Sequence, residues 1–288
     1  MLRREQIEHY RQQGFLHIPH VFSPDETRDL QDDMDWMIQT WSHTGPGWSG
    51  PWRRAYMDEQ TERKSKLVSM HKLHFYVASW MRAATHPGLC EAMADLLDGC
   101  VELHDTTMHV KPPQTGHPFP MHQDWPFYPH ADERYVDVLV HLDDTRHENG
   151  EIRFVGGSHK NGPLPHITQF PDGSGCTPHL PTDEYRLEDT LAVPAKAGDV
   201  VVFNICTVHG SYINQTDQPR RMVRIGYRCP DNAQYDGDSV GRPDVMVWGR
   251  RPRAAGQPLF SDEAPEADRA NVPDMPESLV MVTNGAMR

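Results

Sequence analysis

The sequence has few basic residues and no long apolar run, and each shortage excludes a class of protein. Its 28 Lys and Arg residues against 41 Asp and Glu give a formal net charge of −13. This charge argues against broad nucleic-acid binding, because phosphate recognition needs a positive surface. No apolar run approaches the roughly 20 residues that a membrane span requires. The polar residues that follow Met1 do not resemble a secretory signal.

Cysteine is also scarce. The five cysteines are odd in number and show none of the close-pair spacings of a metal site. Free thiols in a reducing compartment are the simplest interpretation. We therefore expect a cytoplasmic protein, a monomer or homodimer, with no nucleic-acid and no membrane partner.

The pattern along the chain predicts helices first and strands afterwards. Residues 4–13 and about 87–98 are predicted helices, and Ser23-Pro24-Asp25-Glu26 is a good start for another. From about residue 100 to 230, short β-rich segments alternate with turns. The predicted strands are Val101–Lys111, Tyr135–Leu142, Glu151–Val155, Asp199–Cys206 and Arg221–Tyr227.

Many short strands with regular turns predict a mainly β fold with flanking helices, a sandwich or jelly roll. We predict one domain over residues 1–288. It would comprise a helical N-terminal support (1–99), a jelly-roll core (100–230) and an irregular C-terminal tail (231–288).

The most informative pattern is His122-Gln123-Asp124, followed later by His209. On an extended strand, side chains two apart point to the same face, so His122 and Asp124 can bind one metal ion together. His209 would add a second imidazole. Two histidines and one carboxylate leave part of the coordination sphere open, which indicates non-haem Fe(II) rather than structural zinc.

Several motifs around this pattern occur in a distinctive order. They are Lys111-Pro112-Pro113, His122-Gln123-Asp124, Gly157-Ser158-His159-Lys160, His209-Gly210-Ser211 and then Arg220. In this order they resemble the phytanoyl-CoA dioxygenase family of Fe(II)- and 2-oxoglutarate-dependent oxygenases. The resemblance implies a double-stranded β-helix, a cupin-like jelly roll, and a single catalytic domain. It also implies Fe(2+) as cofactor, with 2-oxoglutarate and O2 as co-substrates.

Carried over to this chain, the resemblance implies that the catalytic residues His122, Asp124 and His209 hold the iron. Arg220 would bind the distal carboxylate of 2-oxoglutarate, because a guanidinium matches a carboxylate with two parallel hydrogen bonds. Ser211 and Thr107 would also contact the co-substrate. Arg221 should point to the opposite face of the strand from Arg220.

The implied function is hydroxylation of a small-molecule substrate (an acyl-CoA, amino acid, organic acid or secondary metabolite), releasing succinate and CO2. Asp124 favours hydroxylation over halogenation, because halogenating relatives replace this carboxylate by a small residue.

Two departures from the family pattern bear on the identity of the substrate. Leu139 stands where well-studied members carry tryptophan, and neither Met70 nor His71 reproduces a lysine used by some members. The alternatives are a non-catalytic cupin-like metal-binding protein, zinc included, and desaturation or ring formation.

Other residues are candidates for the substrate pocket. The remaining histidines are mostly interpreted as structural, but His109 shares a strand face with Thr107 and Lys111 and is a minor candidate for facing the cavity. The aromatic residues Trp125, Phe127 and Tyr128 are candidate lining. Trp48, Trp52 and Arg54 are candidates for a lid. The basic stretch 53–66 could meet the phosphates of an acyl-CoA.

Overall fold

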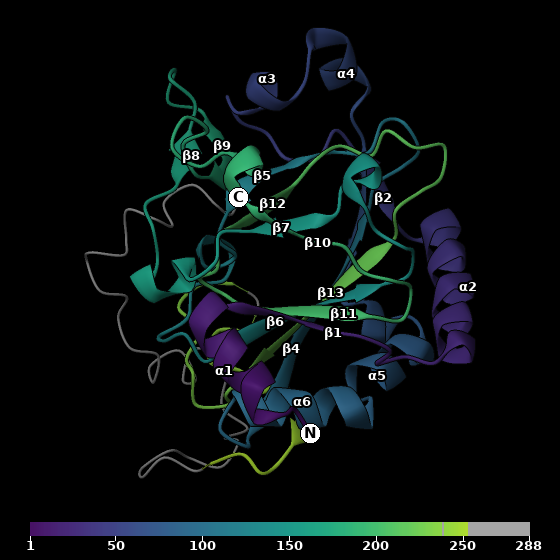
Figure 1. Ribbon diagram of the computed structural model, residues 1–288, viewed down its shortest axis with the longest axis vertical. Coiled ribbons are helices and arrows are strands. Elements are labelled where there is room, and N and C mark those ends of the chain that lie inside the picture. The colour runs from purple at the N-terminus through teal and green to yellow at the C-terminus, as the bar shows by residue number, and fades with distance from the viewer. Residues whose placement is uncertain (238, 253–288) are drawn as a thin grey trace.

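A computed structural model of the chain describes residues 1–237 and 239–252. Its centre is two β-sheets that face each other, with helices covering the outside of the larger one (Figure 1). The larger sheet is eight-stranded, in the order β1-β11-β6-β13-β4-β3-β2 with β14 paired to β4. Its strands are β1 (Phe15–Ile18), β2 (His43–Gly45), β3 (Leu67–His71), β4 (Val101–Val110), β6 (Tyr135–His141), β11 (Val200–Asn204), β13 (Met222–Arg228) and β14 (Val245–Trp248).

The smaller sheet has the order β10-β7-β12-β5, and a separate hairpin pairs β8 with β9. Its strands are β5 (Phe119–His122), β7 (Ile152–Phe154), β10 (Leu191–Val193) and β12 (His209–Ser211), and the hairpin consists of β8 (Ile167–Gln169) and β9 (Gly175–His179). The mainly β jelly-roll fold predicted from the sequence is confirmed.

Strand β11 shows why two layers form on the larger sheet. Successive side chains of a strand point to opposite faces. Val200 and Val202 accordingly join the core beneath the helices, whereas Val201 and Phe203 join a second core between the two sheets. The almost continuous apolar sequence of this strand follows from burial of both faces.

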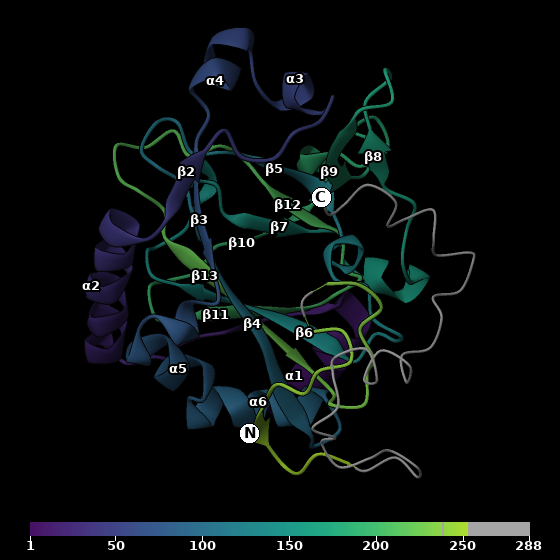
Figure 2. The same ribbon diagram turned by 180° about the vertical axis from the view of Figure 1, so that it is seen from behind.

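The helices lie mainly on the outer face of the larger sheet, which Figure 2 shows from behind. They are α1 (Arg4–Gln13), α2 (Pro24–Thr40), α3 (Arg53–Tyr56), α4 (Glu59–Lys64), α5 (Ala78–Ala84) and α6 (Pro87–Leu96). The predicted start of α2 is confirmed. The Ser23 side chain accepts a hydrogen bond from the Glu26 backbone amide, and the Glu26 carboxylate accepts one from the Ser23 amide. Within residues 1–237 and 239–252, no helix is long and apolar enough to cross a membrane.

Several element boundaries differ from the sequence predictions. The loosely alternating sequence from Phe15 to Phe22 predicts a short strand, but β1 ends at Ile18, because the chain turns through His20, whose φ is 55°. The N-terminal part contributes β1, β2 and β3 to the larger sheet as well as helices, so 1–99 is more than a helical support. Within the predicted irregular tail, β14 pairs with β4, while 253–288 lie outside the described residues.

Candidate active site

Two histidines from neighbouring strands form the centre of the site. His122 is the last residue of β5 and His209 the first of β12, and the antiparallel register places them directly opposite each other. Asp124 lies beside both, with its Oδ1 3.4 Å from His122 Nε2 and 3.7 Å from His209 Nε2. One potential ligand atom from each of the three residues lies within 4.8 Å of the other two. The structure thus brings together the three residues that the sequence singled out.

Hydrogen bonds from Nδ1 to backbone carbonyls fix the orientation of both imidazoles. Nδ1 of His122 donates to the Pro120 carbonyl at 2.7 Å, and Nδ1 of His209 donates to the Thr207 carbonyl at 2.9 Å. A carbonyl only accepts, so the proton sits on Nδ1 and the Nε2 lone pair faces the shared space. Burial lowers the pKa of His209 to about 3, which keeps this imidazole neutral as a metal ligand requires.

Asp124 was expected on the same extended strand as His122, but it lies in the turn that follows this strand. Strand β5 ends at His122, and Asp124 has helical backbone angles at the start of η2 (Trp125–Phe127). The turn is held by Gln123, whose buried amide donates to the carbonyls of Gly162 and Cys206 at 2.9 and 2.6 Å. Its Oε1 accepts from the Leu164 amide at 2.7 Å. Sequence reasoning missed this positioning role of Gln123.

The carboxylate of Asp124 is suited to a cation. Burial alone would raise its pKa, but the neighbouring His209 and His122 and the Arg224 guanidinium outweigh burial and hold the pKa below its ordinary value. Its Oδ2 is buried and, among the described residues, has no hydrogen-bond partner. A buried anionic oxygen without a partner is costly unless a ligand satisfies it. The donor set and this orphaned oxygen fit a divalent metal such as Fe(II).

Arg220 lies deep beside this centre. Its side chain is 1% exposed, and its Nη1 contacts the Met222 sulfur at 3.3 Å. Within the part of the chain that the structure describes, no carboxylate lies within 4.0 Å of the guanidinium and its buried Nε has no acceptor. Burial lowers the pKa of Arg220 only to about 10, so it remains charged at neutral pH. A buried cation without a counter-ion is suited to an anionic ligand.

Ser211 and Lys111 lie next to Arg220. Lys111 and Arg220 pair through their backbones, and the Lys111 ammonium donates to the Ser211 hydroxyl at 2.7 Å and to the Tyr212 carbonyl. Burial and the charge of Arg220 lower the pKa of Lys111 well below its ordinary value. In the sequence, Lys111 belongs to the Lys-Pro-Pro motif and ends a predicted strand, but no role in the site is predicted for it. Its place in the Lys-Pro-Pro motif was the sequence signal that could have identified it as a site residue.

These groups line a cavity of about 500 Å³, which we call the inner cavity. It brings the three candidate metal ligands together with Arg220 and Ser211. Its other lining residues are Trp48, His109, Phe119, Leu139, His141, Thr145, Gly150, Ile152, Phe203, Met222 and Arg224. His109, which the sequence offered only as a minor candidate, and Leu139 both line this cavity.

A larger cavity of about 1480 Å³, the outer cavity, lies on the other side of Asp124. Asp124, His109, Trp48 and Arg224 line both cavities. The remaining lining residues are His43, Gly45, Pro46, Gly47, Leu67, Ser69, His71, Lys72, His104, Asp105, Thr107, Phe127, Tyr128, Gln234 and Gly237. None of residues 53–66 lines either cavity, so the basic stretch does not face them.

Thr107 departs from its expected position. It lines the outer cavity and not the inner one that holds Arg220 and Ser211. Its hydroxyl donates to Asp105 Oδ2 at 2.7 Å and accepts from Arg224 Nη2 at 3.2 Å. The alternation of side chains along a strand correctly predicted which face of β4 carries Thr107. It could not predict which of the two cavities Thr107 lines. The implied co-substrate contact of Thr107 is therefore not retained.

The three lid candidates differ. The Trp48 ring packs edge-on to the His122 imidazole at 4.6 Å between centroids and lines both cavities. Trp52 is instead fully buried against Tyr56 and His117, and Arg54 lines neither cavity. Only Trp48 covers the metal-ligand candidates.

A family model described as phytanoyl-CoA dioxygenase (PhyH) matches residues 10–222, which contain the three candidate metal ligands as well as Ser211 and Arg220. The chain belongs to this family. As a phytanoyl-CoA dioxygenase family member it is a dioxygenase that uses Fe(II) and 2-oxoglutarate, as its curated relatives do.

Curated relatives cover most of the chain. A probable alpha-ketoglutarate-dependent hypophosphite dioxygenase of Stutzerimonas stutzeri is 25% identical, over 88% of this chain and 90% of that protein. A methylphosphonate hydroxylase of Gimesia maris is 25% identical, over 82% and 83%. Among solved structures, EctD from S. alaskensis with 2-oxoglutarate and 5-hydroxyectoine aligns with a TM-score of 0.63. That match has 22% identity over 88% of this chain and 86% of the other, and it shows the shared fold.

Proposed function

We propose that His122, Asp124 and His209 hold the ferrous ion and that Arg220 binds the distal carboxylate of 2-oxoglutarate. The observation that carries this proposal is the inner cavity, where a three-residue metal-ligand set and a buried, unpaired guanidinium share one space. Ser211 and Lys111 stand beside Arg220 and would complete the carboxylate site. When bound, iron and 2-oxoglutarate supply the oxidising chemistry, in which O2 is consumed and the keto acid is released as succinate and CO2.

We further propose that the reaction is hydroxylation of an unactivated C–H bond of a small molecule held in the outer cavity. Asp124 supports this choice over halogenation, because its carboxylate occupies the third ligand position. The two cavities meet at Asp124, so a substrate in the outer cavity would lie next to the metal. Trp48 would help to exclude water at this junction. The relatives described above act on small molecules, hypophosphite and methylphosphonate, rather than on an acyl-CoA.

The test is release of succinate from 2-oxoglutarate by protein supplied with Fe(II) and O2. Asp124→Ala should abolish it, whereas Asp183→Ala, at an exposed position, should leave it unchanged. A protein that binds iron stoichiometrically but releases no succinate would refute the oxygenase assignment. That result would favour the alternative of a non-catalytic metal-binding protein.

We also propose a cytoplasmic location, a monomeric or homodimeric state and no nucleic-acid partner. The five cysteines are all free, and four of them are buried, which suits a reducing compartment. The net charge of −13 disfavours binding to phosphate backbones. Light scattering during size-exclusion chromatography would give the oligomeric state.

A further inference from the structure

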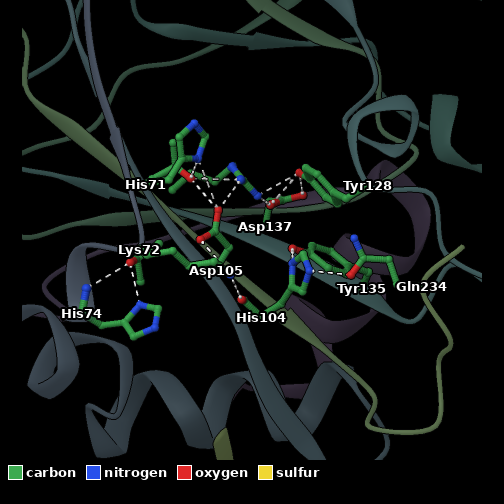
Figure 3. A network of polar contacts seen from close by, with 12 residues as sticks. His71, Lys72, His74, His104, Asp105, Tyr128, Tyr135, Asp137 and Gln234 are labelled. Carbon is green, nitrogen blue, oxygen red and sulfur yellow. Dashed lines mark hydrogen bonds and ion pairs between the residues drawn. The ribbon is translucent and has the colours of Figure 1, made fainter. Parts of the chain in front are cut away.

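A network of charged groups lies on the wall of the outer cavity (Figure 3). At its centre Arg224 donates to Asp137 Oδ1 at 2.7 Å and to Asp105 Oδ2 at 3.3 Å. The Tyr128 hydroxyl also donates to Asp137, at 3.0 Å. These buried contacts occupy the Arg224 guanidinium with protein partners. Arg224 therefore has a structural role in the cavity wall and is not the group that binds a ligand.

Lys72 stands at the edge of the same network, and its contacts are different. Its ammonium donates to the His104 carbonyl at 3.2 Å and lies 3.5 Å from Asp105 Oδ1. Two contacts leave at least one of its three N–H donors unused. About a quarter of the Lys72 side chain (26%) is exposed, and Lys72 is one of the residues that line the outer cavity. Lys72 is thus the cation of the outer cavity that a ligand can reach.

The backbone at Lys72 supports a functional role. Its φ of 58° and ψ of 41° place it in the left-handed region, which residues with a Cβ seldom adopt. Such strain persists where the surrounding structure imposes it, and it is frequent at ligand sites. Here the turn ends β3 and begins η1 (Leu73–Phe75), and the lysine lines the outer cavity.

The two carboxylates that line the outer cavity are already engaged. Asp105 accepts from Thr107 and Arg224, and Lys72 and His71 lie within 3.7 Å of its oxygens. Asp124 belongs to the metal-ligand set. A cationic substrate would have to displace these partners, whereas an anionic one meets a free donor.

We propose that the substrate in the outer cavity is a compact organic acid, a carboxylate or a phosphonate, and that Lys72 binds its anionic group. This proposal rests on the proposed function and names the substrate class for the same site. Asp105 acts as a positioning residue, because its Oδ1 lies 3.5 Å from the Lys72 ammonium.

The proposal is tested by calorimetric titration of protein loaded with Ni(II), which replaces the reactive iron, and 2-oxoglutarate. The titrants are propylphosphonate, butyrate, 1-butanol and butylamine, of similar size but different charge. At least one of the two anions should bind more tightly than the alcohol or the amine. Lys72→Met should weaken that binding about ten- to a hundredfold, the usual range for a lost charge-assisted hydrogen bond. Lys72→Arg should restore part of it, and Lys160→Met, at an exposed position, should change nothing.

Equal binding of the alcohol or amine, failure of both anions to bind, or unchanged binding in Lys72→Met would each overturn the proposal. Succinate release in the absence of added substrate separates this outcome from failure of the proposed function. If the wild-type protein with iron releases succinate while the anions fail, only the substrate class is wrong. If it releases none, the oxygenase assignment itself fails.

Discussion

Arg220 and Arg221 are adjacent in the chain but lie in opposite environments. Arg221 forms ion pairs with Asp143 and Asp35 at 2.7 and 3.0 Å and faces outward. Arg220 is buried in the inner cavity without a carboxylate partner among the described residues. This pair therefore provides a matched test of which guanidinium binds the co-substrate.

Arg220→Gln should raise the KM for 2-oxoglutarate about ten- to a hundredfold, because a charge-assisted hydrogen bond to its distal carboxylate is lost. Arg221→Gln should leave this KM unchanged and only lower thermal stability, since it removes a partly exposed ion-pair network. Initial rates of succinate formation at varied 2-oxoglutarate provide the measurement. A larger KM change in Arg221→Gln than in Arg220→Gln would contradict the assignment.

Individual residues also show which parts of the site could be predicted from the sequence. The set of His122, Asp124 and His209 and the choice of Arg220 over Arg221 could be predicted, because the order of the motifs resembles that of the family. The extended strand expected through Asp124 was wrong, since β5 ends at His122. Thr107 could not be placed, since periodicity gives a face and not a position between two cavities. Lys72 escaped notice because its inward direction depends on a left-handed turn that the local sequence does not announce.

At the scale of elements, the connection after β5 determines the metal geometry. The buried Gln123 amide joins this connection to the segments around Gly162, Leu164 and Cys206. Asp124 follows directly, so the position of its carboxylate depends on these hydrogen bonds.

Gln123→Leu should weaken Fe(II) binding about ten- to a hundredfold, the usual effect of losing a group that orients a metal ligand. Stability should also fall by about 1–3 kcal/mol, because buried backbone groups lose their partners. Anaerobic Fe(II) titration and urea unfolding measure the two effects. Gln60→Leu, at an exposed position on α4, is the control. Unaltered iron affinity in Gln123→Leu would show that Asp124 is held by other contacts.

Helix α2 offers an independent test of local structure. Ser23→Ala should destabilise the protein by about 1 kcal/mol, because the Glu26 amide loses its cap. Ser23→Thr should retain most of the stability. Urea midpoints give the comparison, and the KM for 2-oxoglutarate should stay constant, since α2 lies on the outer side of the larger sheet (Figure 1). A shifted KM would indicate that α2 is coupled to the inner cavity.

The long strands of the larger sheet and helices α1, α2 and α6 were predictable, because their periodicity is strong. Strands β5, β10 and β12 have three or four residues each and were not predicted, because they are too short for a periodic signal, whereas β7 was predicted as Glu151–Val155. Two of them nevertheless carry metal-ligand candidates. Their strand character comes from pairing within the smaller sheet, which is a tertiary effect.

At the scale of the whole molecule, buried histidines should make stability depend on pH. Burial lowers the pKa of His104, His141 and His166 to about 3 and that of His117 to about 2. The unfolded chain binds protons at these histidines near pH 6.5, but the folded chain does not. Acidification from pH 6.5 toward 3 therefore favours unfolding.

The metal-free protein should lose stability steeply below pH 6.5. Each of these histidines adds a slope of up to about 1.4 kcal/mol per pH unit. Urea unfolding between pH 8 and 5 is the measurement, with chelator present so that metal ligation does not contribute. A constant free energy of unfolding between pH 6.5 and 5 would mean that these imidazoles accept protons within the fold.

The two sheets contribute different parts of the chemistry. Residues from the smaller sheet and its connections surround the metal position, whereas β3, β4 and β13 of the larger sheet provide most of the charged wall of the outer cavity. Mutations on one sheet can therefore alter what the enzyme accepts without disturbing how it oxidises. Because of this separation, substrate specificity can change through single mutations while the oxidising chemistry is kept. Directed evolution aimed at β3 and the turn after it is the most direct way to change the specificity.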